Sequence, residues 1–152
     1  NLSVTDRHVV PPARSRAEAS GFASAAIELP NGQIVTGQTG ELLGSSAAVL
    51  MNAIKDLAGI PREEPILSPE SITPIQTLKT KYLGSKNPRL HTDEVLIALS
   101  ATAATNEDAA LALTQLPKLR GCQVHSSVLL GSADTNTLKK LGCNVTCEPK
   151  TM

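Results

Sequence analysis

The eight residues from Asn87 to Glu94 hold the densest group of chemically capable side chains in the sequence. They read Asn-Pro-Arg-Leu-His-Thr-Asp-Glu and stand directly before an apolar pattern typical of a helix. Arg89 offers a planar fork of donors that suits an anion. His91 can donate or accept a proton near neutral pH. The run therefore predicts a ligand site in which Arg89 holds an anionic group and His91 acts as acid or base.

Helix initiation explains part of the same run without any chemistry. The Asn-Pro pair favours a turn or an extended backbone. Thr92 suits the N-cap position, and the two carboxylates after it suit the positive end of a helix dipole. This structural interpretation leaves Arg89 and His91 unexplained, so both interpretations stay open.

Two other groups of polar residues are weaker candidates for a site. Ser45 and Ser46 end a glycine- and serine-rich loop before a helix, where backbone N–H groups bind anions. The loop lacks the glycine spacing of nucleotide-binding motifs, and a serine cap is the simpler interpretation. His125 precedes two serines in a predicted strand. A serine nucleophile needs a third, orienting group, and no G-x-S-x-G turn is present, so a polar strand end is favoured.

Composition predicts one soluble domain in the cytoplasm. The 152 residues are 41% apolar but only 1% aromatic, and 14 basic residues balance 14 acidic ones. Without stacking aromatics or a basic stripe, nucleic acid is not an expected partner. No apolar run approaches the length of a membrane span, and no signal peptide is visible. Because the chain begins at Asn1, we expect the natural start to lie further upstream.

The three cysteines predict free thiols rather than a disulfide framework or a metal site. Cys143 and Cys147 fall in a predicted strand, about 13 Å apart on one face, which is too far for a disulfide. No C-x-x-C and no zinc-type spacing of histidine and cysteine occurs with the remaining Cys122. We therefore expect neither a metal nor another cofactor.

The order of predicted elements indicates a three-layer α/β/α sandwich with a mixed sheet and helices on both faces. After an extended lead-in over 1–12, the predicted helices are 13–20, 47–58, a third that starts at 68–70 or at 73–74 and runs to 83, 93–104, 107–116 and 132–141. The predicted strands are 23–29, 33–36, 65–68, 122–130 and 144–148. An Asn-Gly turn joins the first two strands as a hairpin.

Four segments together resemble a known bacterial family. They are Asp6–Arg14 (DRHVVPPAR), Ile27–Gly37 (IELPNGQIVTG), Pro88–Leu99 (PRLHTDEVLIAL) and Leu138–Pro149 (LKKLGCNVTCEP). They are similar to the C-terminal domain of the domain-of-unknown-function 1846 family. The resemblance covers nearly the whole chain and implies that residues 1–152 form the single C-terminal domain of a longer protein. It brings no established activity and no catalytic residue with it.

The element order also resembles the cytidine-deaminase-like fold. In deaminases the helix after the hairpin carries a zinc-binding His-x-Glu or Cys-x-Glu, and a Pro-Cys-x-x-Cys follows later. Here the corresponding helix start reads Ser45-Ser46-Ala47-Ala48, and no Pro-Cys-x-x-Cys is present. The resemblance therefore implies a topology without the zinc chemistry.

Two classes of function remain. In the first, the domain contributes a small-molecule site to a larger enzyme, through Arg89 and His91 with Ser45, Ser46 and His125. In the second, it is a non-catalytic structural or oligomerisation module that packs on a second copy or on the rest of the full-length chain. Convergence of the candidates on one cavity would favour the first class. Since each candidate lacks a necessary partner group, the 152 residues alone are expected to show no robust catalysis.

Overall fold

Four short strands form one mixed sheet in the computed structural model, which describes residues 8–149. The strands lie in the order β2-β1-β3-β4. Their bounds are β1 Ser24–Glu28, β2 Ile34–Gln38, β3 Gln123–Ser126 and β4 Asn144–Cys147. β1 is antiparallel to both of its neighbours, whereas β3 and β4 are parallel. The carboxyl ends of β2, β3 and β4 therefore lie at the same edge of the sheet.

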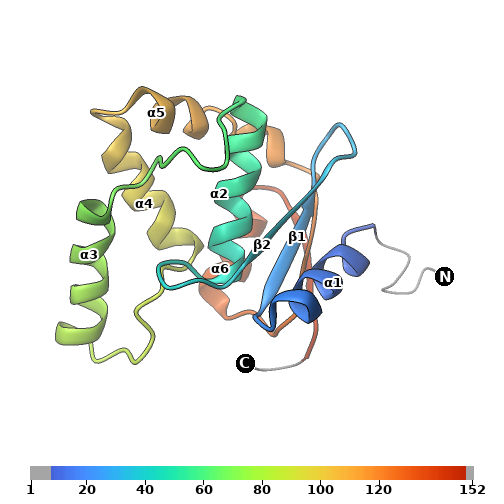
Figure 1. Ribbon diagram of the computed structural model, residues 1–152, viewed down its shortest axis with the longest axis horizontal. Helices are drawn as coiled ribbons and strands as arrows, with labels where there is room; N and C mark the ends of the chain where they lie inside the picture. Colours follow the sequence, from blue (N-terminus) through green and yellow to red (C-terminus); the bar gives the residue numbers. More distant parts are fainter. Residues whose placement is uncertain (1–7, 150–152) are drawn as a thin grey trace.

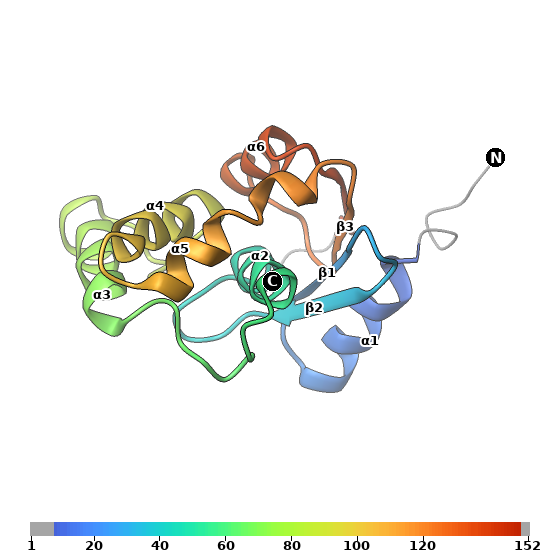
Figure 2. The same cartoon turned by 90° about the horizontal axis from the view of Figure 1, so that it is seen from above.

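Helices cover both faces of this sheet (Figures 1 and 2), which confirms the predicted α/β class. The helices are α1 Val10–Ser20, α2 Ser45–Ala58, α3 Pro69–Thr77, α4 Thr92–Ala103, α5 Glu107–Leu113 and α6 Ser132–Lys140. A π-turn, η2 (Leu78–Tyr82), continues α3, and a 3-10 turn, η3 (Leu116–Leu119), precedes β3. α1 lies on one face, α2 and α6 lie on the other, and α3, α4 and α5 pack outside them.

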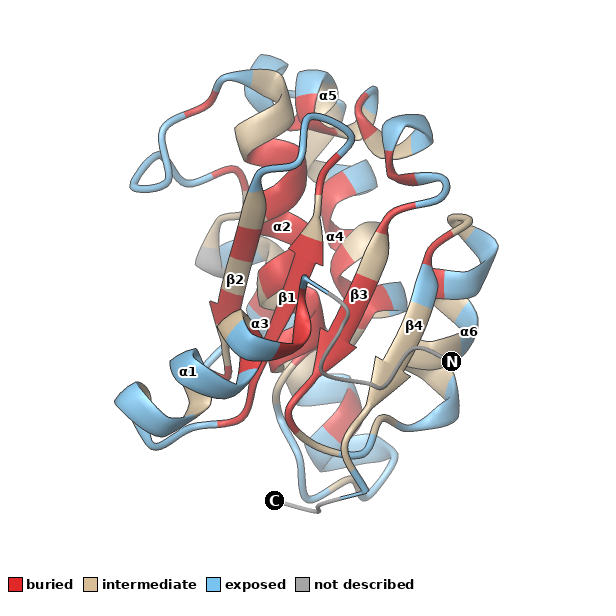
Figure 3. Cartoon of the chain, turned by 90° about the vertical axis from the view of Figure 1, so that its right-hand side faces the viewer, coloured by how far each residue is buried: buried red, intermediate tan, exposed pale blue. Residues whose placement is uncertain are grey.

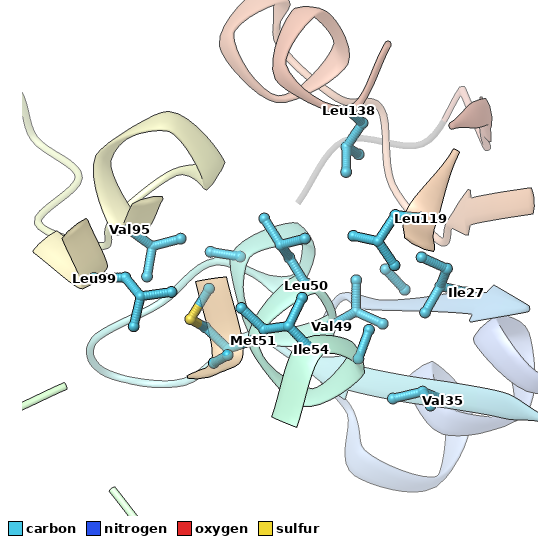
Figure 4. Packing of buried hydrophobic residues seen from close by; sticks show 14 of the residues in the cluster. Ile27, Val35, Val49, Leu50, Met51, Ile54, Val95, Leu99, Leu119 and Leu138 are labelled. Carbon is cyan, nitrogen blue, oxygen red and sulfur yellow. The ribbon is translucent and has the colours of Figure 1, made fainter. Parts of the chain in front are cut away.

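Alternation along β1 divides its side chains between the two faces. Ala26 packs with Val9 and Ala13 in a small cluster under α1. Ile27 faces the other way, into the main core. That core is built around α2, as Figure 4 shows, with Val49, Leu50 and Ile54 buried between the sheet and the outer helices. β1 and most of β3 are buried, whereas the edge strand β4 is only partly covered (Figure 3).

Gly37 lets β2 approach α2 closely. A Cβ at this position would lie 2.5 Å from the backbone nitrogen of Val49, closer than real contacts allow. A side chain here would push α2 away from the sheet and with it the loop that leads into α2. The glycine in the hairpin return strand is therefore required by packing rather than by a turn.

Residues 65–68 form no strand, contrary to the prediction. This segment instead runs between α2 and α3, where Ile66 and Leu67 line a cavity beside α2. An apolar run this short cannot by itself distinguish a strand from a buried loop, since only a neighbouring strand would supply ladder hydrogen bonds.

The predicted cap of α4 was wrong. His91 rather than Thr92 is the N-cap residue of α4, and Gly131 is that of α6. Thr92 is the first helical residue, and Asp134 accepts hydrogen bonds from it across the two helices. Sequence reasoning looks for a local partner and so misses a cap supplied by another helix. α5, by contrast, has a local cap, because the side chain of Asn106 accepts from the backbone N–H of Ala109.

Several element bounds also differ from the predictions. Residues 10–12 belong to α1 rather than to an extended lead-in, because two prolines fit the first turn of a helix; residues 1–7 lie outside the described part. The strand predicted for 122–130 ends at Ser126, whose hydroxyl bonds to the backbone of Val128 in the following turn. Cys143 precedes β4, so it does not share that strand with Cys147.

Candidate functional site

The starts of α2, α4 and α6 meet at the carboxyl edge of the sheet. α2 follows β2 and α6 follows β3, so both begin at this edge. The start of α4 is held between them through Leu90. Its N–H donates to the carbonyl of Leu42 at 2.9 Å, and its carbonyl accepts from Gly44 at 3.2 Å. Ligands of open α/β sheets commonly bind outside the carboxyl ends of strands. We call this place the carboxyl edge.

His91 and Asp134 form a pair at this edge. The Nδ1 atom of His91 lies 3.6 Å from an Asp134 oxygen, and 40% of the histidine side chain is exposed. The neighbouring Asp134 carboxylate raises the pKa of His91 above its ordinary value, against the opposing effect of partial burial. Burial alone would raise the pKa of Asp134, but the nearby His91 and the hydrogen bonds from Thr92 bring that pKa below the usual value. The pair therefore favours a protonated imidazole beside an ionised carboxylate.

Asp134 also holds the first turn of α4. One of its oxygens accepts from the Thr92 backbone N–H at 2.8 Å and from the Thr92 hydroxyl at 2.9 Å. This carboxylate thus neutralises the positive end of α4 while orienting His91. A protonated imidazole beside a carboxylate can act as a proton donor to a bound ligand.

Arg89 lies beside His91, with the buried Leu90 between them. Leu90 pairs with Leu43 in an isolated β-bridge. The Nε of Arg89 donates to the carbonyl of Gly40 at 2.5 Å. The terminal guanidinium nitrogens have no acceptor among the described residues and can bind an anion.

An ion pair anchors the same segment from behind. Lys79 in η2 donates to Glu94 at 2.9 Å and to the carbonyl of Arg89. Glu94 also accepts from the backbone N–H of His91 at 2.8 Å. These contacts fix the backbone of Arg89 and His91, so Asp93 and Glu94 serve the helix start as the sequence predicts.

Ser45 and Ser46 are buried at the start of α2. No side chain caps this helix, and the hydroxyl of Ser46 has no hydrogen-bond partner among the described residues. Other buried hydroxyls gather at the same edge, which the sequence did not reveal because they come from distant segments. They belong to Ser24, Thr39, Thr92, Ser126 and Ser127.

His125 lies on the opposite face of the sheet from α2. It is in register with Ala26, which packs under α1. Its Nδ1 contacts the hydroxyl of Thr146 at 2.7 Å, and its Nε2 bonds to the carboxylate of Glu148, which Arg14 of α1 also binds. His125 therefore belongs to a buried network that joins α1 to β4, separate from His91.

A cavity of about 510 Å³ lies beside α2, between the 38–43 and 65–72 segments. None of the five predicted site residues lines it, although Gly40, which Arg89 binds, does. Lys55 lines this cavity and is a further functional candidate. The sequence did not indicate it, because no pattern in the neighbouring residues predicts that this lysine is buried. Across residues 8–149, no three histidine, cysteine or acidic side chains gather as metal ligands would. Nor does any helix in that range have the length and apolarity needed to cross a bilayer.

Comparison with known proteins places the chain in a family. Residues 5–152 match the family described as "Domain of unknown function DUF1846, C-terminal". A UPF0371 protein of Corynebacterium glutamicum is 57% identical over 148 residues, which are 97% of this chain and 30% of that protein. A UPF0371 protein of Streptococcus thermophilus is 54% identical over 151 residues, 98% of this chain and 31% of that protein. The chain thus spans less than a third of these relatives and belongs to the DUF1846 C-terminal domain family.

Proposed function

We propose that this domain contributes an anion-binding surface at the carboxyl edge to a small-molecule site that a longer protein completes. The observation that carries the proposal is the meeting of three helix starts around the His91–Asp134 pair. α2 and α6 have no side-chain caps, so their first N–H groups are available to an anion.

Each side chain at the carboxyl edge has a separate role in this proposal. Arg89 binds a carboxylate or phosphate oxygen with its terminal nitrogens, and protonated His91 adds a second donor. Asp134 holds the imidazole, and Ser46 adds a buried hydroxyl behind the helix start. If the ligand reacts, His91 is the proton carrier. The remaining reacting groups come from the part of the longer protein outside this domain, so the domain alone has no robust activity.

Inorganic phosphate is the probe that tests this surface. We expect phosphate to raise the melting temperature of both this chain and the longer protein, because a ligand that binds only the folded state stabilises it. The double variant Arg89→Ala/His91→Ala loses the shift, while Lys86→Ala, a matched exposed cation, keeps it. Equal shifts in the double variant and the wild type would reject the proposal.

A second function has its own supporting observation. Leu78, Tyr82 and Leu83 are 49%, 69% and 70% exposed around the π-turn η2. In a π-turn, residues four and five apart lie on the same face, and exposed apolar groups of this kind mark contact surfaces. This surface would make the domain an assembly module that packs on the rest of the longer protein.

Separate expression of the two parts tests the assembly function. The domain should co-purify with the remainder of the longer protein, and Tyr82→Ser/Leu83→Ser should weaken this association. The matched variant Leu129→Ser removes an exposed leucine from another part of the surface and should have no effect. If the η2 variant associates as strongly as the wild type, the contact surface does not include Tyr82 and Leu83.

A further inference from the structure

Lys55 is a buried lysine and is one of the residues that line the 510 Å³ cavity. The cavity lies between α2 and the 38–43 and 65–72 segments, and Figure 2 shows how the chain enters and leaves α2 on this side. Its walls are mainly apolar and include Leu42, Met51, Ile66 and Ile72. Such walls, with few polar groups and a volume of roughly 300–1,000 Å³, are typical of small-molecule sites.

The Lys55 ammonium has no bonded carboxylate among the described residues. Its Nζ donates to the carbonyls of Arg62 at 2.7 Å and Glu64 at 2.5 Å, which leaves one of its three protons unused. Asp56, the carboxylate next to it in sequence, is bound by two nitrogens of Arg62 instead. The side chains of Glu63 and Glu64 act on Lys55 only through space.

This lack of a counter-ion is costly. A buried charge normally has a hydrogen-bonded partner of opposite sign, because removal from water is otherwise unfavourable. Desolvation accordingly lowers the pKa of Lys55, with the Arg62 charge as the next cause. An anionic group entering the cavity would remove this cost and gain a charge-assisted hydrogen bond.

We propose that the cavity binds a small molecule with an apolar body and one anionic end, and that this end pairs with the ammonium of Lys55. The apolar wall excludes a small, fully hydrated anion as the main ligand. Glu41 also lines the cavity and is exposed, and its carboxylate disfavours a second negative charge on the ligand. Gln38 and Asn52 supply the other polar positions in the wall. This site does not use the His91–Asp134 pair, although the 38–43 loop borders both places.

A pair of probes that differ only in charge tests the proposal. Decanoate and decanol, kept below their aggregation concentrations at pH 7.5, are titrated calorimetrically into this chain and into the longer protein. We expect saturable binding of decanoate, at least tenfold tighter than decanol. In Lys55→Met this preference disappears through weaker decanoate binding, while Lys55→Arg keeps it. Lys81→Met, which removes an exposed lysine, leaves both affinities unchanged.

A variant that fills the cavity provides a second test of the proposal. Ala48→Leu places a larger side chain in the wall and should abolish binding of both probes. Absence of decanoate binding to the wild type would overturn the proposal, as would equal affinity for the two probes. Binding to this chain but not to the longer protein would also overturn it, because the rest of the longer chain would then occupy the cavity. The wild-type comparison decides the matter even if Lys55→Met fails to fold.

Discussion

Lys79 and Lys55 are equally buried, with 7% of each residue exposed, yet their surroundings differ in one respect. Lys79 donates to the carboxylate of Glu94 and so completes an ion pair at the start of α4. Lys55 donates only to backbone carbonyls beside a cavity. The Lys79 charge has its counter-ion and serves the structure, whereas the lack of a bonded carboxylate at Lys55 is the basis of the proposed anion site. The comparison therefore distinguishes Lys79, which holds the start of α4 in place, from Lys55, where we propose that a ligand binds.

The largest loss of stability is expected when the Lys79–Glu94 ion pair is removed. Lys79→Met should lower the free energy of unfolding by about 2–4 kcal/mol, because it leaves Glu94 partly buried without its cation. Urea denaturation measures this value, with the exposed Lys81→Met as control. Similar losses in the two variants would mean that the pair is not an anchor.

A smaller effect is expected for the carboxylate that joins α6 to α4. Asp134→Ala should cost about 2 kcal/mol, since it removes the acceptor of two Thr92 hydrogen bonds. Asp108→Ala is the control, because Asp108 lies exposed in the first turn of α5. The same denaturation measurement applies. A cost below that of the control would show that the α4 start does not depend on α6.

Lys55→Met should cost about 1 kcal/mol or less, since the released burial penalty offsets the two lost carbonyl bonds. The sign of its pH dependence is distinctive. The folded-state pKa of Lys55 lies below 10.5, so the unfolded chain binds more protons between these two values. Wild-type stability should therefore rise relative to Lys55→Met as pH increases across that interval. Denaturation at a series of pH values measures the difference, which would stay constant if burial did not affect Lys55.

The smallest effect is expected at His91, whose side chain is 40% exposed. Its titration by NMR should have a midpoint above 6.5, and Asp134→Asn should lower that midpoint. The stabilisation from this pair is fully present below 6.5 and is lost as pH rises through the folded-state pKa of His91. An unchanged midpoint in Asp134→Asn would exclude Asp134 as the cause.

Periodicity and turn residues predicted most of the fold. The α/β class, the Asn-Gly hairpin and the helices after it follow from local patterns that the structure confirms. The predictions of a strand at 65–68 and of a strand that continues to residue 130 were wrong. Strand formation at these places depends on neighbouring strands that the sequence does not specify. Local sequence patterns did not predict the π-turn after α3 either.

The sequence by itself determined which residues have the chemistry: Arg89 and His91 stand out by type and spacing. Only the tertiary structure decided their partners. Asp134 reaches His91 from another helix, and the sheet places His125 on its far face. Lys55 looks like any helix lysine until packing buries it beside a cavity. The physical reason is that burial and charge pairing depend on distances between segments remote in sequence, whereas helix and turn preferences depend on neighbours along the chain.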